Sequence, residues 1–348
     1  MAIIAPDIGI DMGTSKTLVY VRKKGILIDE PTVLVMERGG KHAVRAIGDE
    51  ALSLLGRTAD DVVAVRPLSE GMIKDFDMTK YMLQYFVRKA IGSSRLVKPR
   101  AIITVPCRIT AIERRAVRQA ALYAGVRPSH LHLVEKPFAA ALGCGLPVFQ
   151  PTGSMVVDIG GGTTEVAVIS LGGVVVAKSI RMGGIKMDEA VAAYIKREYN
   201  MLIGDRTAED IKLNLGSALP VSEYRDALIR GRDMVTNLPR TASIGSDKVY
   251  EALKAPCAQI LGAIKSVLEH TPPELAGDVM RSGIHLTGGA SQLFGLDQYI
   301  ASALGIRVQC AKDAAACAGR GVGELAEHFD HLARIGKSSF LRDDQDNI

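Results

Sequence analysis

The chain has 348 residues, of which 47% are hydrophobic and 23% charged, and it contains 35 glycines and no tryptophan. This composition is typical of a globular protein, and the length is sufficient for two domains. The net charge of +5 and the dispersed Lys and Arg residues do not indicate a nucleic-acid-binding protein. No apolar run reaches the roughly 18 residues of a membrane span, and the short uncharged start is unlike a signal peptide. The five cysteines lack zinc or disulfide spacing, so we expect reduced thiols in a cytoplasmic protein.

The first predicted element is a hairpin over residues 8–21, "IGIDMGTSKTLVYV". An apolar strand ends at Asp11, a short turn follows, and a second apolar strand resumes. Such a pattern is typical of a β-hairpin. The turn comprises Gly13, Thr14, Ser15 and Lys16.

A helix predicted over residues 80–91, with core-type apolar spacing, leads into the loop 92–100, "GSSRLVKPR". This loop carries Leu96 and Val97 at its tip. Three cations surround them: Arg95, Lys98 and Arg100. Exposed apolar residues ringed by cations suit insertion among anionic head groups, so we predict a membrane contact at Leu96 and Val97. The alternative is an ordinary loop whose Leu96 folds back onto the core.

Strands and helices then alternate, which is typical of α/β proteins. The expected ranges are 100–106, 110–125, 130–135 and 137–143. The first of these helices opens with Thr110 and Glu113 at capping-box spacing and closes at Gly125.

Residues 155–169, "MVVDIGGGTTEVAVI", repeat the plan of the first hairpin, and Asp158 stands in the place of Asp11. The second turn comprises Gly160, Gly161, Gly162 and Thr163. The repeat predicts two α/β domains of similar design, with a boundary near residues 148–153.

Two later stretches suit a nucleoside. Residues 207–212, "TAEDIK", look like a helix start with Glu209 and Lys212 on one face, where they would bond a ribose and an adenine edge or form an ordinary ion pair. The strand in residues 283–289 ends in a bare turn that a flat base or ribose can approach closely, and a helix is expected to start there. The turn and helix start comprise Gly288, Gly289, Ala290 and Ser291.

The two Gly-rich turns indicate a phosphate clamp. Backbone N–H groups of a turn without Cβ atoms converge on one point and bind anions. Asp11 and Asp158 would not touch phosphate themselves but can hold Mg²⁺ through its waters. Either turn alone would more often be a plain hairpin, but two copies at matched positions, each with an Asp, favour the clamp. The absence of GxxxxGK[ST] excludes a P-loop NTPase.

Together these features resemble the actin/Hsp70/hexokinase superfamily and, within it, the MreB family of bacterial actins, from about residue 7 to about residue 331. The stretches that carry the resemblance are "DMGTSKTLVYVRKKGILIDEPTV", "GRTADDVVAVRPLSEGMIKDF", "VVDIGGGTTEVAVISLGGVV", "IGDRTAEDIKLNLGSA" and "HLTGGASQLFGLD". The resemblance implies an α/β, actin-like ATPase fold of two duplicated ribonuclease-H-like domains with a nucleotide cleft between them. It also implies domain I at 1–150, with an inserted subdomain at about 32–66, and domain II at 151–313, with an inserted subdomain at about 186–247. A helix at about 314–335 would pack back on domain I, and a polar tail would follow at 336–348.

The resemblance also implies ligands and partners. ATP or ADP would bind with Mg²⁺, which Asp11 and Asp158 would organise through water as part of the catalytic centre. Phosphate contacts are implied at Gly13 to Lys16 and Gly160 to Thr163, ribose and base contacts at Glu209 and Lys212, and adenosine contacts at Gly288 to Ser291. The family forms filaments of identical subunits in the cytoplasm, on the inner face of the membrane, where they guide the cell-wall elongation machinery and set rod shape. No nucleic-acid partner is expected.

The sequence departs from the family at three positions. Lys16 stands where family members usually carry Asn, and Ile185 replaces an acidic residue. In "LVEKPFAAA", residues 133–141, Lys136 stands where the family has the acidic residue that positions the attacking water. A charged ammonium cannot accept a proton from water, and strand alternation would point Glu135 the opposite way, so we expect slow or absent hydrolysis. The alternative is a shift of one residue that leaves Glu135 in the site as the catalytic group.

Two other functions remain compatible with parts of the sequence. A small-molecule kinase or phosphatase of the same superfamily would need a carboxylate base in the cleft, and Lys136 occupies the nearest place. A chaperone-like module would need a substrate-binding domain for which the 348 residues leave no room.

Overall fold

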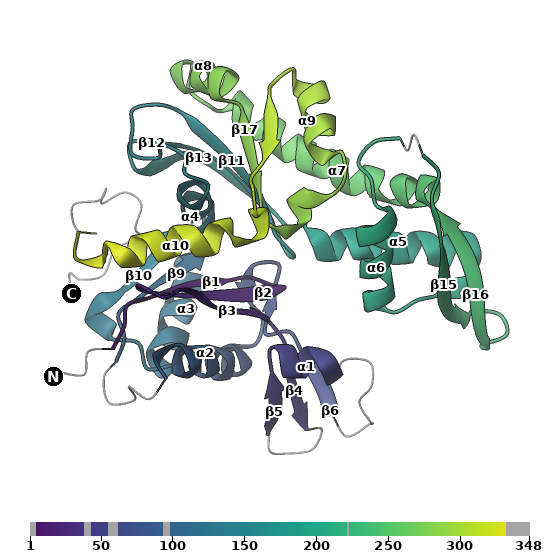
Figure 1. Ribbon diagram of the computed structural model, residues 1–348, viewed down its shortest axis with the longest axis horizontal. Helices are drawn as coiled ribbons and strands as arrows, with labels where there is room; N and C mark the ends of the chain where they lie inside the picture. The colour runs from purple at the N-terminus through teal and green to yellow at the C-terminus, as the bar shows by residue number, and fades with distance from the viewer. Residues whose placement is uncertain (1–4, 38–42, 55–61, 93–97, 221–222, 332–348) are drawn as a thin grey trace.

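The computed structural model describes residues 5–37, 43–54, 62–92, 98–220 and 223–331. Two five-stranded sheets form its centre, one in the lower and one in the upper half of Figure 1, with helices packed against both. This mixture confirms the predicted α/β class. None of the helices in the described ranges is long and apolar enough to cross a lipid bilayer.

Sheet I has the strand order β10-β9-β1-β2-β3. Its strands are β1 (Ile8–Met12), β2 (Lys16–Val21), β3 (Gly25–Pro31), β9 (Ala101–Val105) and β10 (Leu131–Glu135). The antiparallel pairing of β1 with β2, with Asp11 opposite Leu18, confirms the first predicted hairpin. On its other side β1 pairs in parallel with β9, which comes from far along the chain.

Sheet II has the order β13-β12-β11-β17-β18 and repeats the pairing pattern of sheet I. Its strands are β11 (Ser154–Ile159), β12 (Thr164–Ser170), β13 (Gly173–Ile180), β17 (Ile284–Thr287) and β18 (Val308–Cys310). The antiparallel pair of β11 and β12 confirms the second hairpin, and β17 is the parallel neighbour of β11. The internal repeat is therefore a repeat of sheet topology.

Helices α2 (Phe76–Ile91) and α3 (Ala111–Tyr123) cover sheet I. The N-terminus of α2 lies earlier than predicted because Asp75 caps it and accepts a hydrogen bond from the N–H of Met78. The capping box of Thr110 and Glu113 at the start of α3 is confirmed.

The helices of sheet II are α5 (Gly184–Tyr199), α6 (Asp205–Leu215), α7 (Ser246–Glu269), α8 (Pro273–Ser282) and α9 (Leu296–Leu304). The helix expected to start at Ala290 was a wrong prediction. Residues Gly289–Gln292 form a single 3₁₀ turn, and α9 starts only after Gly295, whose left-handed backbone (φ 72°) interrupts any continuous helix.

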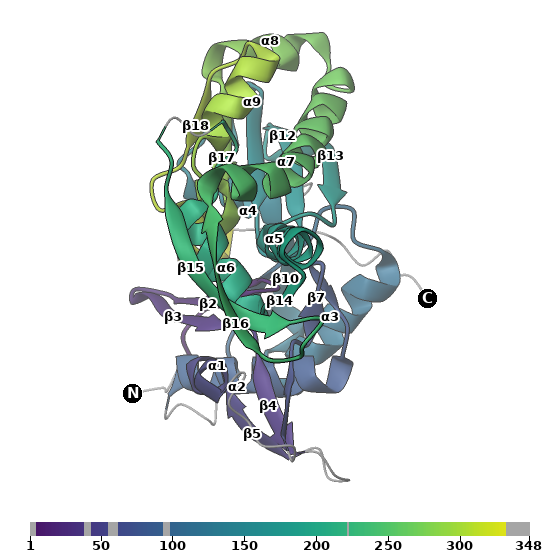
Figure 2. The same ribbon diagram turned by 90° about the vertical axis from the view of Figure 1, so that its right-hand side faces the viewer.

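Two smaller sheets extend from the central ones, one at the bottom and one at the right of Figure 1; the right-hand side of that view faces the viewer in Figure 2. One consists of β4 (Leu34–Glu37), β5 (Val44–Ile47) and β6 (Val62–Val65), next to α1 (Asp49–Leu54). The other consists of β14 (Met201–Leu202), β15 (Asp226–Asp233) and β16 (Pro239–Gly245). The short pair β7 (Leu68–Ser69) and β8 (Met72–Ile73) completes the strands of the described ranges.

Helices α4 (Lys136–Gly143) and α10 (Cys317–Glu327) lie between the two sheets (Figure 1). Helix α10 packs on β1 and β2, whereas α4 packs on β11 and β12. The two helices cross so closely that a Cβ atom at Gly321 would overlap the carbonyl oxygen of Ala139. Their contact buries a shared core, which fixes the first residue of α4 relative to both sheets.

Candidate functional site

The two Gly-rich turns meet at one place. The turn between β1 and β2 and the turn between β11 and β12 are each closed by the same backbone hydrogen bond, from Gly13 N to Lys16 O (3.0 Å) and from Gly160 N to Thr163 O (2.9 Å). A Cβ atom on Gly161 would overlap the hydroxyl of Ser15, and one on Gly162 would overlap that of Thr14. Only glycine permits this approach, so the two hairpins present their turns side by side.

The two aspartates lie beneath these turns, and each is held by a threonine from the neighbouring parallel strand. Thr104 of β9 donates its hydroxyl to Asp11 Oδ1 at 2.6 Å, and Thr287 of β17 donates to Asp158 Oδ1 at 2.9 Å. All four side chains are buried. The duplicated topology thus produces the same charge-assisted hydrogen bond twice.

Lys136 joins the two aspartates. Its Nζ lies 3.4 Å from Asp11 Oδ1 and 3.7 Å from Asp158 Oδ2. Burial favours the neutral amine, but the carboxylates of Asp11, Asp158 and Glu165 outweigh it and hold the pKa of Lys136 above its ordinary value. Lys136 is therefore a cation at the floor of the site.

Glu135 is turned away from this centre. The strand β10 ends at Glu135, and α4 begins at Lys136, so the two side chains leave the backbone in different directions. Glu135 accepts a hydrogen bond from the N–H of Arg108 at 3.2 Å, and burial raises its pKa. The geometry thus favours the alignment that places Lys136 in the site over the alternative with Glu135.

Two lysines predicted to contact the nucleotide, Lys212 and Lys16, already have polar partners within the protein. Lys212 donates to Gly184 O at 3.2 Å and lies 2.7 Å from Asp188 Oδ1, while Glu209 lines the cleft. Burial raises the pKa of Asp188 to about 6. Lys16 also has a carboxylate partner, Asp29, at 3.0 Å.

Gly288, Gly289 and Ala290 line the cleft as predicted, but the side chain of Ser291 does not. Its hydroxyl is buried and donates to the carbonyl of Gly288 at 2.7 Å, which closes the 3₁₀ turn. The local hydrogen bond takes the donor of this side chain, and the predicted nucleotide contact at Ser291 stays a prediction.

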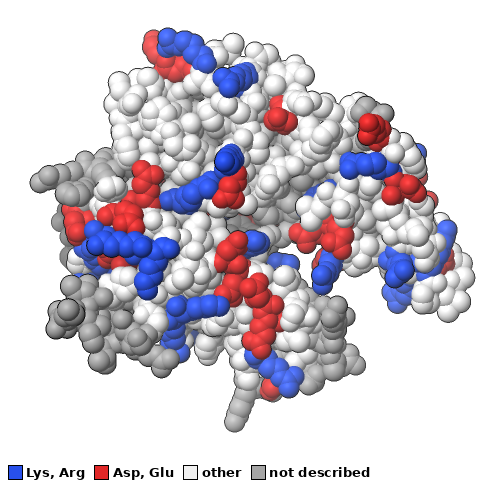
Figure 3. Space-filling view, viewed as in Figure 1, with Lys and Arg blue, Asp and Glu red and all other residues white. Residues whose placement is uncertain are grey.

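Most of these groups line one cleft of about 1770 Å³ between the two sheets; Glu135, Thr287 and Ser291 are outside its lining. The cleft volume exceeds the roughly 300–1,000 Å³ of an ordinary small-molecule pocket. A small-molecule ligand could therefore contact both sheets without filling the cleft. Figure 3 shows acidic side chains gathered where the molecule is hollowed between its halves. The carboxylates of the lining make the cleft attractive to cations, while the turns offer N–H groups to anions.

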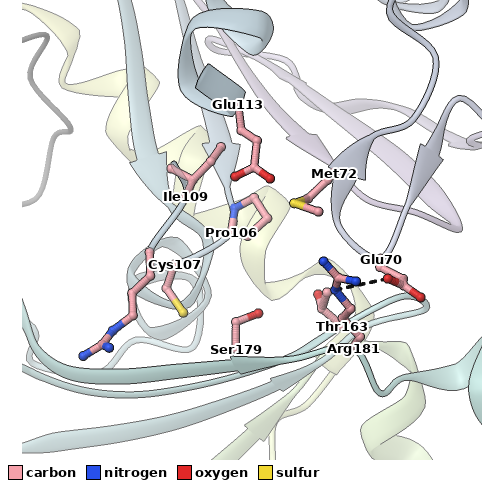
Figure 4. Close-up of a pocket in the computed structure, with 10 residues that line it drawn as sticks. Glu70, Met72, Pro106, Cys107, Ile109, Glu113, Thr163, Ser179 and Arg181 are labelled. Atoms are coloured by element: carbon pink, nitrogen blue, oxygen red, sulfur yellow. Dashed lines mark ion pairs between the residues drawn. The ribbon is translucent and has the colours of Figure 1, made fainter. Parts of the chain in front are cut away.

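A second, smaller pocket of about 250 Å³ adjoins the second turn at Thr163 (Figure 4). Glu70, which follows β7, forms an ion pair of 3.2 Å with Arg181, which follows β13. Beside it, buried Glu165 accepts hydrogen bonds from Cys107 N (2.8 Å) and Ser179 Oγ (2.9 Å). Polar contacts thus join the two sheets next to the turns.

Thr104 and Thr287 were not predicted from the sequence. A signal existed, because "IITVP" and "IHLTGG" each carry a threonine near the end of an apolar strand. Recognising it requires knowing that β9 and β17 pair in parallel with the aspartate-bearing strands.

The predicted membrane residues Leu96 and Val97 lie outside the described residues. The membrane contact therefore stays a prediction, but one of the three cations expected beside these residues has partners within the protein. Arg100 is ion-paired with Asp7 at 2.6 Å and with Asp330, so its charge faces the protein. Lys98 is exposed.

Comparisons with known proteins agree with this architecture. A model of the MreB/Mbl protein family matches residues 5–334. Cell shape-determining protein Mbl of Bacillus cereus is 46% identical over 331 residues, covering 95% of this chain and 98% of that protein. Cell shape-determining protein MreB of Escherichia coli K12 is 45% identical over 328 residues, covering 93% and 94%.

Solved structures of MreB5 of Spiroplasma citri superpose on the whole chain. The form bound to AMPPNP has a TM-score of 0.87 and 31% identity, covering 95% of this chain and 98% of that one. The form bound to ADP has a TM-score of 0.88 and 32% identity, covering 96% and 100%.

The threonine–aspartate pairs predict a stability effect. Replacing Thr104 or Thr287 by valine removes a hydrogen bond to a buried carboxylate, and each change should lower the free energy of unfolding by about 1–3 kcal/mol. Urea unfolding followed by circular dichroism measures this. The matched Thr104→Ser and Thr287→Ser variants keep the hydroxyl and should stay close to the native protein; valine variants as stable as the serine ones would contradict the assignment.

Proposed function

Because this chain belongs to the MreB/Mbl protein family, we propose that it is an ATP-binding, actin-like cytoskeletal protein that polymerises into filaments and helps to determine rod cell shape. The superposition on MreB5 confirms the actin-like fold. The cell-shape role is supported by the names of the Mbl and MreB relatives. Filaments would lie in the cytoplasm at the inner face of the membrane and organise the elongation machinery.

One observation carries the proposal: two duplicated hairpins, one from each sheet, bring their glycine turns into contact at the floor of one cleft. A ligand with several linked anionic groups would hold both turns at once. The AMPPNP and ADP bound by MreB5 support adenine nucleotides as these ligands.

We propose the following contacts along the nucleotide. The N–H groups of Gly13 to Lys16 and of Gly160 to Thr163 would donate to the phosphates, and Glu209 and Lys212 would meet the ribose and base. Gly288 to Ala290 would face the adenosine. Mg²⁺ would enter on the phosphates, and Asp11 and Asp158 would attract it weakly because Lys136 lies between them.

We also propose the domain divisions that the resemblance implies, 1–150 and 151–313, with inserts at about 32–66 and 186–247. They are supported by the position of the small sheets β5-β4-β6 and β14-β15-β16 within those inserts. A nucleotide bound across the cleft would fix the two domains relative to each other, and a subunit of fixed shape repeats more readily along a filament.

Hydrolysis of ATP would be slow. The side chain that reaches the phosphate side of the cleft is an ammonium held charged by carboxylates, and it has no lone pair with which to take a proton from water. Lys136 would bind and stabilise phosphate charge without activating a nucleophile.

The proposal predicts nucleotide-dependent assembly. ATP should shift the purified protein from the supernatant to the pellet on ultracentrifugation, because occupancy of the cleft fixes the subunit shape. The proposed filament would be visible by electron microscopy of the pellet. A protein that stays in the supernatant with ATP while phosphorylating small molecules would instead support the kinase alternative.

Lys136→Glu should accelerate phosphate release from the polymer by about 10²- to 10⁴-fold, the usual contribution of a positioned general base. The control is Lys254→Met, which removes a lysine ion-paired with Glu251 on α7, away from the cleft. Rapid release by the native protein, equal to that of Lys136→Glu, would refute slow hydrolysis.

The membrane proposal rests on Leu96 and Val97. The double variant Leu96→Ser, Val97→Ser should float with anionic vesicles at least about tenfold less than the native polymer, because each apolar side chain contributes roughly 1.5–3 kcal/mol when buried. Met280→Ser is the control, since Met280 is an exposed apolar residue on α8. Equal flotation of the double variant and the native polymer would remove this contact from the proposal.

A further inference from the structure

The space between Asp11 and Asp158 already contains a positive charge. Nζ of Lys136 lies within 4 Å of an oxygen of each carboxylate, although β1 and β11 belong to different sheets. A threonine hydroxyl engages Oδ1 of each aspartate; the lysine faces the other oxygen of Asp158, Oδ2, and shares Oδ1 of Asp11 with Thr104. This is where a divalent ion with its water shell would be placed by two carboxylates that do not bind it directly.

The contacts of Lys136 differ from those of the other cleft lysines. Lys16 and Lys212 approach their carboxylate partners to 3.0 and 2.7 Å, which are direct hydrogen-bonding distances. Lys136 stays at 3.4 and 3.7 Å, beyond the usual N–H···O range of about 2.7–3.2 Å. Its ammonium therefore balances two carboxylates through contacts longer than those of the other two lysines, and we infer that it can turn toward a phosphate oxygen.

The charge balance of the site disfavours Mg²⁺. Two aspartates alone would leave two negative charges, and the ammonium reduces this to one while repelling a nearby dication. Among the described residues no three His, Cys, Asp or Glu side chains are grouped so as to hold a metal ion. Mg²⁺ would also need near-octahedral oxygen ligands at about 2.0–2.1 Å in a space that Lys136 partly fills. The residues present fit an ammonium better than a hydrated Mg²⁺.

We propose that Lys136 takes the place of the divalent cation, so that the cleft binds the polyphosphate of an adenine nucleotide without requiring Mg²⁺. This inference rests on the nucleotide binding proposed above. In it, Lys136 neutralises the aspartates and donates to the phosphates, while the backbone N–H groups of the two turns supply the remaining donors. It is a binding role, separate from any effect on hydrolysis.

The test is the affinity for ATP, measured by isothermal titration calorimetry with excess MgCl₂ and with excess EDTA. For the native protein, removal of Mg²⁺ should change the dissociation constant by less than about threefold. For Lys136→Glu, the site would regain a strong need for a cation, and EDTA should weaken binding by about 100-fold or more. Lys136→Met, which keeps the length of the side chain but not its charge, should lose at least about tenfold in EDTA.

The control is Lys254→Met, which should match the native protein in both buffers because its ion pair with Glu251 lies outside the cleft. Thermal unfolding of each variant shows whether it is folded. If the Lys136 variants do not fold, the native protein alone still tests the inference. A dissociation constant for ATP that is about 100-fold higher in EDTA than in MgCl₂ would overturn it.

The outcomes separate the two proposals. Binding of ATP only in the presence of Mg²⁺ would overturn the inference and leave the nucleotide-binding function intact. Absence of ATP binding in both buffers would overturn the function and the inference together. Equal, Mg²⁺-independent binding by the native protein and Lys136→Met would also reject the assignment, because the charge on Lys136 would not be responsible.

Discussion

The structure depends on keeping two buried carboxylates, one from each central sheet, at one point. Asp11 and Asp158 would repel each other and resist burial if nothing compensated them, because an unpaired buried charge is costly. Two threonine hydroxyls and one ammonium provide the compensation. The threonines act within each sheet, whereas Lys136 acts between the sheets. The lysine is therefore an electrostatic tie across the duplicated fold as well as part of the candidate site.

The packing of α4 and α10 makes that tie possible. The glycine at position 321 lets α10 approach α4 until backbone meets backbone, and this contact sets where the first turn of α4 begins. A cation in the first turn of a helix opposes the helix dipole, which favours negative charge there by about 0.3–1 kcal/mol. The three carboxylates near Lys136 outweigh that preference. The helix dipole thus favours an acidic side chain at position 136, whereas the neighbouring carboxylates favour a basic one.

Local features of the sequence predicted much of this arrangement, and the failures have physical causes. Both hairpins and the capping box of Thr110 follow from neighbouring residues, so they were predictable. Thr104 was missed because its partner is reached only through parallel pairing of distant strands. The hydroxyl of Ser291 is taken by its own turn, a local bond that the sequence pattern did not reveal. The direction of Lys136 depends on where β10 ends and α4 starts, a boundary that tertiary packing sets.

Two consequences of Lys136 arise from different properties of one atom. Slow hydrolysis would follow from what the charged amine lacks, a lone pair that could take a proton from water. Binding without Mg²⁺ would follow from what it has, a permanent positive charge between two aspartates. A methionine in this place would still offer no base to the water but would lose the positive charge, and a glutamate would reverse both properties. Because the two properties separate in methionine, where hydrolysis stays slow but the need for a cation returns, the chemistry of the site and its affinity can be attributed independently.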